Sequence, residues 1–451
     1  AGWIDSDSLP EDRVKSFEGR EFELVFSDEF NREGRTFHDG TDPRWTAVNK
    51  NDYTNHALQF YSHDYVGTRN GSMFIITNNT NVDFEYYDTP HKKFKKMSKT
   101  YVSAMVQSWN KFCFTGGIVE IQATLPGAAD IGGLWPAMWL MGNLARATFT
   151  TSSDFQWPWS YDVCNRTTDE QVAWQHQQEI SACDGAVHWG FHPHNGRGAP
   201  EIDILEAMSG DKIGEPYMST SLQVAPGTDA MERPDLGEIP HEGSWYHKEI
   251  FYGNNSRLNN WFYGVYLEHK NKEKSYYCDA VSGNHQLESS HFQTMHTYRL
   301  EWQPGSDKQQ GYIDWYVDGE RVYGITDTTL VSYHLSQIPV EPMYLILNTA
   351  ISQTWGFPNC DLGECACDCF DASDPACACS LAPNFYSLFP AEFEVDSVRV
   401  YQQENNSLHT VGCDPANYPT KDFIKAHSDR YKDPDMEHVM LAVAMGGGRC
   451  T

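Results

Sequence analysis

The sequence contains no run of 18 apolar residues and is short of basic side chains, and each shortage excludes a class of protein. Without a long apolar run, the chain offers no candidate for a transmembrane helix. Lys and Arg number 33 against 62 Asp and Glu, which gives a formal net charge of −29. Such a charge repels nucleic acids and anionic membranes. We therefore expect a neutral partner, no nucleic acid, and no membrane contact from this part of the chain.

Three further absences narrow the functional class. The sequence has no glycine-rich loop of the phosphate-binding kind and no repeat of 20–50 residues, which argues against a nucleotide-dependent enzyme and against a solenoid. The first residues, Ala1-Gly-Trp-Ile-Asp5, also lack the basic and apolar segments of a secretion signal. We expect that a leader has been removed and that any membrane anchor belongs to another part of the precursor.

The chain is rich in cysteine and in glycosylation sequons, which together indicate an oxidising compartment. It has 12 cysteines, and disulfides persist mainly in secreted and lumenal proteins. Asn-x-Ser/Thr sequons are typical of surface loops in such proteins. We therefore expect a location in the secretory pathway, vacuolar or extracellular. The expected glycosylation sites are Asn70, Asn78, Asn165, Asn254 and Asn405.

Six of the cysteines crowd into residues 360–379, and two interpretations of this insert are open. Zinc is one, but the Cys-x-Cys steps differ from the usual Cys-x-x-Cys pairs and no histidine lies among them. Disulfides are the favoured interpretation, although their connectivity does not follow from the sequence. The six residues are Cys360, Cys365, Cys367, Cys369, Cys377 and Cys379.

Short strand-like runs separated by Gly, Asn, Asp or Pro predict an all-β, antiparallel sandwich. The dipeptide Asp318-Gly319 stands between alternating apolar residues and predicts a two-residue β-hairpin. The strand pattern ends near Gln402. The predicted strands are Phe22–Phe26, Ser72–Thr77, Gly117–Ala123, Tyr298–Trp302, Tyr312–Val317, Met343–Leu347 and Val395–Tyr401.

The pattern along the chain predicts one large domain with short extensions. We expect an N-terminal segment over residues 1–19, a β-sandwich domain over residues 20–402, and a C-terminal tail over residues 403–451 that wraps the domain. A short helix capped near Thr420 is expected in the tail. Residues 147–200 lack clear periodicity and predict long loops.

The most informative stretch is Glu201-Ile-Asp-Ile-Leu-Glu206, because it places three carboxylates inside an apolar, β-branched run. In a regular strand Glu201 and Asp203 would share a face, and Glu206 would point to the opposite one. One extra residue, most simply within Ile204-Leu205, would form a β-bulge and return Glu206 to the face of the other two. The bulge would line up all three carboxyl groups on one surface.

Two carboxyl groups about 5–5.5 Å apart are suited to a retaining glycosidase. We interpret Glu201 as the nucleophile and Glu206 as the acid/base. Asp203 would form a hydrogen bond with the nucleophile and help to hold a proton on its neighbours by charge repulsion. The alternative is an exposed edge strand that carries solvated acids. The flanking residues Pro200 and Ala207-Met208 are not charged, which favours the buried site.

Aromatic residues near the acidic strand are suited to a sugar ligand, because sugar rings present apolar C–H faces. Trp135 and Trp139 lie an even number of residues apart and would share one face of a strand. A tryptophan-rich core explains the same spacing equally well. The histidines His188, His192 and His194 offer metal ligands, but exposed loop histidines are the favoured interpretation. No calcium-binding spacing is evident, so no metal or cofactor is expected.

Several motifs occur in the order typical of glycoside hydrolase family 16, and the sequence resembles that family over residues 20–435. Within it, further segments resemble the branch associated with fungal-type β-1,6-glucan synthesis. The family motifs are Val25-Phe-Ser-Asp-Glu-Phe30, Trp135-Pro-Ala-Met-Trp139, the acidic strand, Tyr298-Arg-Leu-Glu-Trp302 and Val398-Arg-Val-Tyr401. The branch segments are Gln107–Gly117, Met141–Arg146, Gly196–Pro200 and Val411–Pro415.

The resemblance implies a β-jelly roll with a concave substrate cleft, and retaining chemistry on β-linked glucans. It implies that Trp135 and Trp139 lie beside the cleft and that Gln223, on the strand after the catalytic one, lies near the cleaved bond. A transglycosylase that forms β-1,6 linkages on β-1,3-glucan is the expected function. A glucanase and a non-catalytic glucan-binding jelly roll are the alternatives. Members of this branch are membrane-anchored, and the segment 360–379 has no place in the family pattern.

Overall fold

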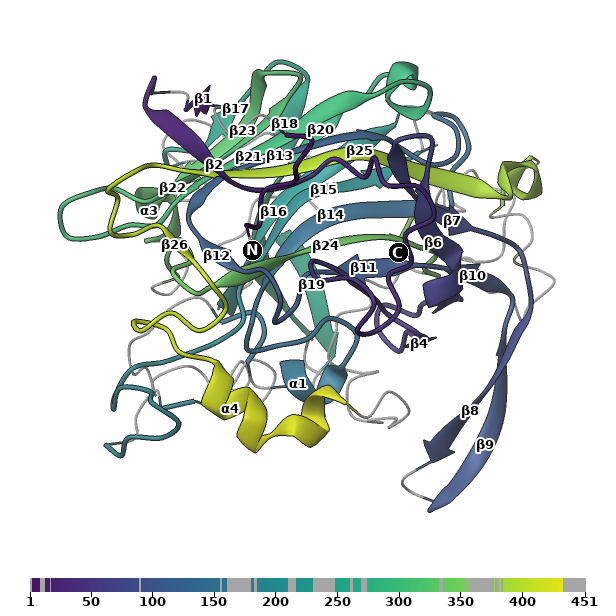
Figure 1. Cartoon of the computed structure of the whole chain (residues 1–451), viewed down its shortest axis with the longest axis horizontal. Coiled ribbons are helices and arrows are strands. Elements are labelled where there is room, and N and C mark those ends of the chain that lie inside the picture. The colour runs from purple at the N-terminus through teal and green to yellow at the C-terminus, as the bar shows by residue number, and fades with distance from the viewer. Residues whose placement is uncertain are drawn as a thin grey trace.

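The structure is a computed structural model that describes most of the chain. The described residues are 2–8, 13–16, 18–88, 91–154, 156–159, 180–181, 185–209, 216–229, 248–259, 263–268, 274–331, 336–353, 355–356, 377, 381–382 and 384–432. Within them, two large antiparallel sheets stack face to face and form a sandwich (Figure 1). The predicted antiparallel jelly-roll sandwich is confirmed.

The first sheet has ten strands among the described residues, in the order β1-β2-β25-β13-β21-β22-β23-β17, with β7 paired to β25 and β6 to β7. Its strands are β1 (Arg13–Lys15), β2 (Glu21–Asp28), β6 (Val66–Arg69), β7 (Ser72–Thr77), β13 (Gly117–Thr124), β17 (Phe251–Tyr252), β21 (His296–Gln303), β22 (Tyr312–Val317), β23 (Glu320–Thr326) and β25 (Ala391–Gln402).

The second sheet has eleven strands in the described part of the chain, in the order β18-β20-β16-β15-β14-β24-β11-β3, with β19 on β20, β12 on β24 and β26 on β12. Its strands are β3 (Thr46–Ala47), β11 (Met105–Gln107), β12 (Phe114–Thr115), β14 (Trp135–Gly142), β15 (Glu201–Met208), β16 (Tyr217–Asp229), β18 (Ser256–Leu258), β19 (Tyr263–Glu268), β20 (Lys274–Gln286), β24 (Met343–Ala350) and β26 (Thr410–Val411). This sheet carries the acidic strand, β15, near its centre.

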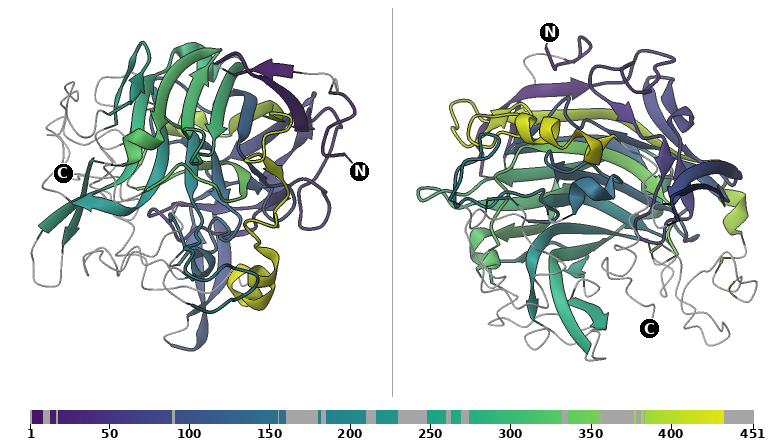
Figure 2. Two further views of the ribbon diagram at one scale, coloured as in Figure 1. Left: turned by 90° about the vertical axis from the view of Figure 1, so that its left-hand side faces the viewer. Right: turned by 90° about the horizontal axis from the view of Figure 1, so that it is seen from below.

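Smaller elements lie around the sandwich. A three-stranded sheet and a two-stranded ribbon complete the described strands, and the described helices are short. Figure 2 shows α4, in yellow, below the sandwich in its left view. The elements are β4 (Lys50–Asn51), β5 (Gln59–Tyr61), β8 (Val82–Asp88), β9 (Lys93–Lys99), β10 (Tyr101–Ser103), α1 (Thr150–Ser153), α3 (Asp327–Leu330), α4 (Lys421–Ala426), η1 (His63–Tyr65), η5 (Ser289–Phe292), η7 (Phe385–Leu388) and η8 (Ser428–Tyr431), where η denotes a 3₁₀ helix.

The main core lies between the two sheets and follows the period-two alternation of their strands. Leu300 and Trp315 come from the first sheet, and Ile204 and Leu347 from the second; each is at most 1% exposed. Each such side chain contributes about 1.5–3 kcal/mol by leaving water. All seven predicted strands are present, and the predicted hairpin is confirmed: Val317 lies opposite Glu320 across two residues of positive φ, as a type I′ turn requires.

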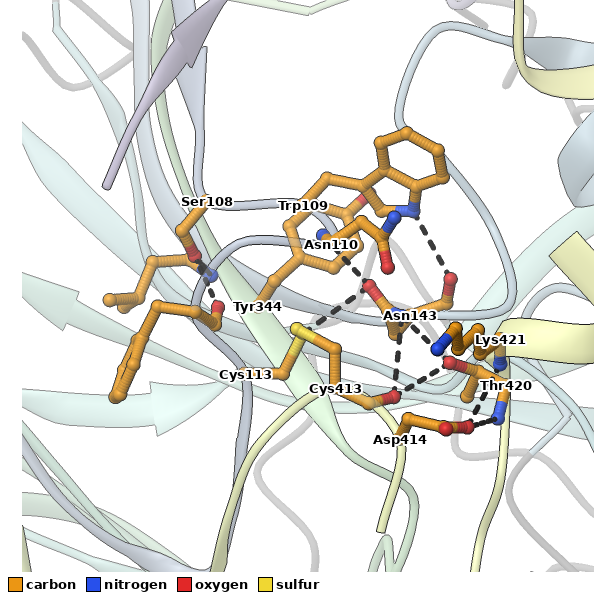
Figure 3. The surroundings of a disulfide bond; sticks show 12 residues. Ser108, Trp109, Asn110, Cys113, Asn143, Tyr344, Cys413, Asp414, Thr420 and Lys421 are labelled. Carbon is orange, nitrogen blue, oxygen red and sulfur yellow. Dashed lines mark hydrogen bonds between the residues drawn. A yellow bond between two sulfur atoms is a disulfide. The ribbon is translucent and has the colours of Figure 1, made fainter. Parts of the chain in front are cut away.

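The C-terminal part described by the structure packs on the domain, and we call residues 412–432 the C-terminal strap. Helix α4 begins after Thr420, as predicted, but the Thr420 side chain does not cap it. Instead the Thr420 hydroxyl donates to the Cys413 carbonyl over 2.6 Å, and Asp414 Oδ1 accepts from the N–H of Thr420 and of Lys421 over 2.8 and 3.0 Å. A disulfide between Cys113 and Cys413 joins the strap to the sandwich (Figure 3).

Candidate active site

The acidic strand β15 contains the predicted bulge. Toward β16, Asp203 pairs with Ser221 and Glu206 with Ser219, so two residues of β15 face one residue of β16. Toward β14, Trp139 pairs with Asp203 and Met138 with Leu205, so Ile204 is the residue without a partner in that ladder. The extra residue therefore lies within Ile204-Leu205, where the spacing of the acids predicts it.

The register also fixes the face on which the acids lie. Trp139 is opposite Asp203 and Ala137 is opposite Glu206, and cross-strand partners share a face of the sheet. Because Ala137 and Trp139 are two residues apart on β14, Asp203 and Glu206 share that face as well. Glu201 lies two residues before Asp203 and joins them. All three carboxyl groups therefore lie on one surface.

Core packing holds the bulge in place. Ile204 and Leu205 are consecutive residues, yet both are buried in the sandwich core, which a regular strand would not allow. The indole N–H of Trp315, on β22 of the opposite sheet, donates to the Asp203 carbonyl over 2.8 Å. This hydrogen bond crosses the core and satisfies a carbonyl at the irregular part of the ladder. The first sheet therefore supports the position of the acids on the second.

Asp203 is the most enclosed of the three acids, with 2% of its surface exposed. Its Oδ2 atom accepts hydrogen bonds from Ser221 Oγ over 2.7 Å and from Gln223 Nε2 over 3.1 Å, both on β16. Gln223 therefore lies at the site, where it contacts an acid of the trio. These two donors favour the charged form of Asp203, while burial opposes it and raises its pKa.

Glu206 is 8% exposed and holds one hydrogen bond from a tryptophan. The indole N–H of Trp135 on β14 donates to Glu206 Oε1 over 3.2 Å. The other oxygen, Oε2, is buried and has no hydrogen-bond partner among the described residues. Burial, followed by the charge of Asp203, raises the pKa of Glu206 well above its usual range. A protonated Glu206 would thus hold a proton ready to donate.

Glu201 is partly buried and receives a hydrogen bond from a residue that lies far away in the sequence. The indole N–H of Trp157 donates to Glu201 Oε2. Burial is the largest effect on the pKa of Glu201 and raises it, and the charges of Asp203 and Glu206 add to the rise. The Trp157 hydrogen bond acts in the opposite direction because it favours the carboxylate. It favours the anion at Glu201, as the Trp135 hydrogen bond does at Glu206.

Trp157 reaches Glu201 because the segment after α1 packs against the entry to β15. The Ala199 N–H donates to the Gln156 carbonyl over 2.8 Å. A Cβ atom on Gly198 would lie 2.5 Å from Trp159, so only glycine allows this approach. The loop that carries Trp157 and the residues before Glu201 are therefore in direct backbone contact.

The C-terminal strap supports the same loop from outside. Thr151 Oγ1 donates to the Arg430 carbonyl over 3.0 Å, and Arg146 Nη1 donates to the Tyr431 carbonyl over 2.8 Å. Near the disulfide, Asn143 Nδ2 donates to Thr420 Oγ1 over 3.0 Å (Figure 3). The strap thus fixes the segment between β14 and Trp157 at several points.

Further aromatic side chains lie beside the acids on the same sheet. The Trp139 indole donates to Asn348 Oδ1 over 2.8 Å, and Asn348 Nδ2 donates to the Tyr61 hydroxyl over 3.2 Å. The Trp135 ring packs against Trp355 with 5.2 Å between ring centroids. Trp135 and Trp139 are each only partly buried, so their rings are accessible next to the carboxyl groups. The structure therefore brings both predicted tryptophans to the acidic site.

The structure also describes predicted histidines, one cysteine of the insert and four of the glycosylation sequons. His192 and His194 are exposed, and among the described residues the one group placed to hold a metal is His38, His63 and Asp64, which includes none of the predicted histidines. Cys377 is disulfide-bonded, whereas the other five cysteines of the insert lie outside the described residues. Asn70, Asn254 and Asn405 are exposed, Asn78 is partly buried, and Asn165 lies outside the described residues.

The contacts that Trp157, Trp315 and Asn348 make at the site were not predicted from the sequence. Trp157 occurs in a segment without periodicity, so nothing near it indicates a partner. Trp315 reads as an ordinary core residue of its strand. Asn348 is the one polar side chain with an amide in the apolar strand Met343–Ala350, and a buried amide in such a run signals a polar network. Only that last signal was available in the sequence.

The chain was compared with known proteins. The sequence profile of the family described as beta-glucan synthesis-associated protein SKN1/KRE6/Sbg1 matches residues 1–362 and 380–442. The gap in this match, residues 363–379, coincides with most of the cysteine-rich insert, which is therefore outside the family pattern. Beta-glucan synthesis-associated protein KRE6 of Saccharomyces cerevisiae is 32% identical over 441 residues, which cover 94% of this chain and 52% of that protein.

A second relative matches to the same extent, and the chain was also aligned with a solved structure. Beta-glucan synthesis-associated protein SKN1 of Candida albicans is 32% identical over 452 residues, which cover 96% of this chain and 52% of that protein. The chain therefore spans about half the length of the curated relatives it matches. The catalytic domain of an endo-1,3-beta-glucanase (laminarinase) from Thermotoga petrophila has 17% identity and a TM-score of 0.47, with 86% of this chain and 100% of that chain covered.

None of the helices in the described residues is long and apolar enough to cross a membrane.

Proposed function

The chain belongs to the SKN1/KRE6/Sbg1 family of beta-glucan synthesis-associated proteins, and on that basis we propose that it is a retaining enzyme that acts on β-glucan. It transfers a glucosyl chain from a β-1,3-glucan donor to a hydroxyl of another glucan and forms β-1,6 linkages or branches. The observation that carries this proposal is the bulge that places Glu201, Asp203 and Glu206 on one face.

Glu201 is the nucleophile and Glu206 is the acid/base. In the first step Glu201 attacks the anomeric carbon while Glu206 gives its proton to the leaving glycosidic oxygen, so that a glycosyl-enzyme forms. In the second step Glu206 removes the proton from the acceptor hydroxyl, whose oxygen attacks the anomeric carbon and displaces Glu201, so that the new bond has the original configuration. The N–H donor from Trp157 supports the anion at Glu201, and the burial that raises the pKa of Glu206 supports its role as the acid.

Asp203 controls the proton between the two glutamates. Three carboxyl groups in one buried site cannot all be ionised, and burial raises the pKa of each. A charged Asp203 helps to hold a proton on its neighbours by charge repulsion, and the attack begins when Glu201 itself carries the charge. Ser221 and Gln223 hold Asp203 in position. Trp135 and Trp139 supply flat surfaces for the donor sugars, and Gln223 lies close enough to the acids to contact the sugar at the cleaved bond.

Trp157 is a positioning residue for the nucleophile, and its replacement gives a testable change in pH dependence. Trp157→Phe removes the N–H that favours the charged form of Glu201, so the pKa of Glu201 should rise further. Because the attack requires the charged form, the acidic limb of kcat/KM should move to higher pH. A hydrogen bond to a charged group contributes about 1.5–3 kcal/mol, so kcat/KM should fall by about 10–100-fold.

The control for this variant is Trp139→Phe, which removes an indole N–H that is bonded to Asn348 and to none of the acids. It should lower activity through substrate binding and leave the acidic limb where it was. An unchanged acidic limb in Trp157→Phe, measured from kcat/KM between pH 4 and pH 8, would rule out the positioning role.

The choice between transfer and hydrolysis requires an acceptor. The protein is incubated with a β-1,3-glucan donor and a short, fluorescently labelled glucan acceptor, and the products are separated by size and subjected to linkage analysis. We expect the label in longer products joined through β-1,6 bonds, because the relatives are named for glucan synthesis. Shortened donor chains with no label in longer products would show a glucanase instead.

The proposal includes a division of the chain into one catalytic domain with two extensions. Residues 20–402 form the catalytic domain, residues 1–19 extend it, and the tail over residues 403–451 packs on it through its described part, residues 403–432. Pairing of β1 with β2 and the hydrogen bonds of the strap support this division.

We place the protein in the secretory pathway, with glycans on its sequons. The Cys113–Cys413 disulfide and the exposure of three sequons support that location.

A further inference from the structure

A strained turn presents one tryptophan to solvent outside the acidic site. Trp189 and Gly190 have φ values of 46° and 80°, and the Phe191 N–H donates to the His188 carbonyl over 2.7 Å. Positive φ at both central residues defines a type I′ turn, in which Asn, Asp or Gly is the usual first residue. A bulky aromatic residue is rare and unfavourable there. The turn therefore holds Trp189 in a costly conformation.

Side chains from the strap and from the core pack against the Trp189 turn and hold it in this conformation. The Trp189 ring lies 5.2 Å from Phe423 on α4 at 89°, and 4.7 Å from His427, measured between ring centroids. Beneath the turn, Phe191 is 1% exposed and packs under the guanidinium of Arg197. Arg197 in turn forms a buried, two-pronged ion pair with Glu341 at 2.6 and 2.8 Å. The Trp189 ring is thus fixed by groups from the strap and from the core.

Despite this support, Trp189 remains accessible, and the loop that carries it has no charged side chain. Trp189 is 38% exposed and its neighbour Val187 is 69% exposed. Residues 185–195 contain no Asp, Glu, Lys or Arg, although the chain as a whole is 21% charged. The exposed polar groups in this stretch are those of histidines, including His192. A fixed indole face with neutral hydrogen-bonding groups beside it suits an uncharged, ring-shaped ligand.

We propose that the Trp189 turn is a second glucan-binding site, separate from the carboxyl groups, on which a glucosyl ring of a long β-glucan stacks. This rests on the proposed function for the class of ligand. The segment runs directly into β15, since Trp189 precedes Glu201 by twelve residues. A polymer held at the turn would keep the donor or acceptor chain near the acids, whereas a short oligosaccharide would occupy the acidic site alone.

The test compares adsorption to a polymer with turnover of a short substrate. Trp189→Asn keeps the turn, because Asn accepts positive φ, and removes the ring. Trp189→Phe retains a flat ring. Phe94→Ser is the matched control, because Phe94 on β9 is an aromatic residue that is even more exposed, at 68%. Each full-length variant is sedimented with particles of insoluble β-1,3-glucan, and its thermal unfolding midpoint is recorded.

We expect the dissociation constant for the particles to rise about five-fold to ten-fold in Trp189→Asn, as loss of one stacked ring requires, and by much less in Trp189→Phe and Phe94→Ser. Turnover of a soluble tetrasaccharide donor should fall far less than adsorption does. The second site would be ruled out if Trp189→Asn and the unchanged protein adsorbed equally, or if the unchanged protein did not adsorb at all. In both cases turnover of the short donor would continue. If the unchanged protein neither turned over the short donor nor adsorbed to the particles, the proposed function itself would be wrong.

Discussion

Glu201→Gln should lower the turnover of β-glucan donors by at least about 10³-fold and leave the fold intact. The amide retains the size and hydrogen-bonding reach of the side chain but cannot attack the anomeric carbon, so the covalent step is lost. It also removes one of three mutually repelling carboxyl groups, which should not destabilise the protein. Activity is measured by release of reducing ends and by transfer to a labelled acceptor, and folding by thermal unfolding.

A matched variant separates loss of the nucleophile from loss of a buried charge. Glu394 lies on β25 of the opposite sheet and is also partly buried. Glu394→Gln should retain activity close to that of the unchanged protein. Normal turnover in Glu201→Gln would eliminate Glu201 as nucleophile.

Addition of azide to Glu201→Gly tests the same role by the stereochemistry of its product. The small anion fills the space of the missing carboxylate and attacks from the face opposite the leaving group. A single displacement on a β-linked donor gives an α-glycosyl azide. Recovery of activity with a β-azide product, or no recovery at any azide concentration, would contradict the assignment.

Glu206→Ala should have the second large effect, and it should depend on the leaving group. Loss of general acid–base catalysis costs about 10²–10⁴-fold for a natural glucan, whose leaving oxygen must be protonated. A donor with an acidic phenol as leaving group does not need that proton, so its first step should remain fast. The glycosyl-enzyme should then accumulate, because no base activates the acceptor.

Azide again distinguishes the two glutamates. In Glu206→Ala it attacks the glycosyl-enzyme already formed on Glu201, so two displacements give a β-glycosyl azide. The opposite configurations from the two variants would assign each carboxyl group to its step. A Glu206→Ala variant that lost the same factor with natural and activated donors would contradict the acid role.

The central feature of the site was predictable because it depends on local spacing. Three acids at positions 201, 203 and 206 of an apolar run can share a face only if one residue is added to the strand, and the structure has that bulge within Ile204-Leu205. The two-residue hairpin at Asp318-Gly319 is local in the same way. Features fixed by neighbouring residues in the chain were therefore recovered.

Features fixed by distant parts of the chain were not. Trp157 bonds to Glu201 across 44 residues, and its loop is supported by strap residues near position 430. The cap of α4 is a local feature that also differs from the prediction, since the Thr420 hydroxyl donates to the Cys413 carbonyl and Asp414 accepts the N–H groups. Propensity predicts where an element begins, whereas packing determines which side chain serves it.

The most direct measurement is to trap the covalent intermediate. A 2-deoxy-2-fluoro β-glucan disaccharide with fluoride as leaving group slows both steps, but its good leaving group lets the first proceed, so a glycosyl-enzyme should accumulate. We predict that mass spectrometry of the intact protein shows one added disaccharide, and that peptide mapping places it on Glu201. Turnover of ordinary donors with no adduct, or an adduct on any other residue, would contradict the proposal that these carboxyl groups perform a double displacement.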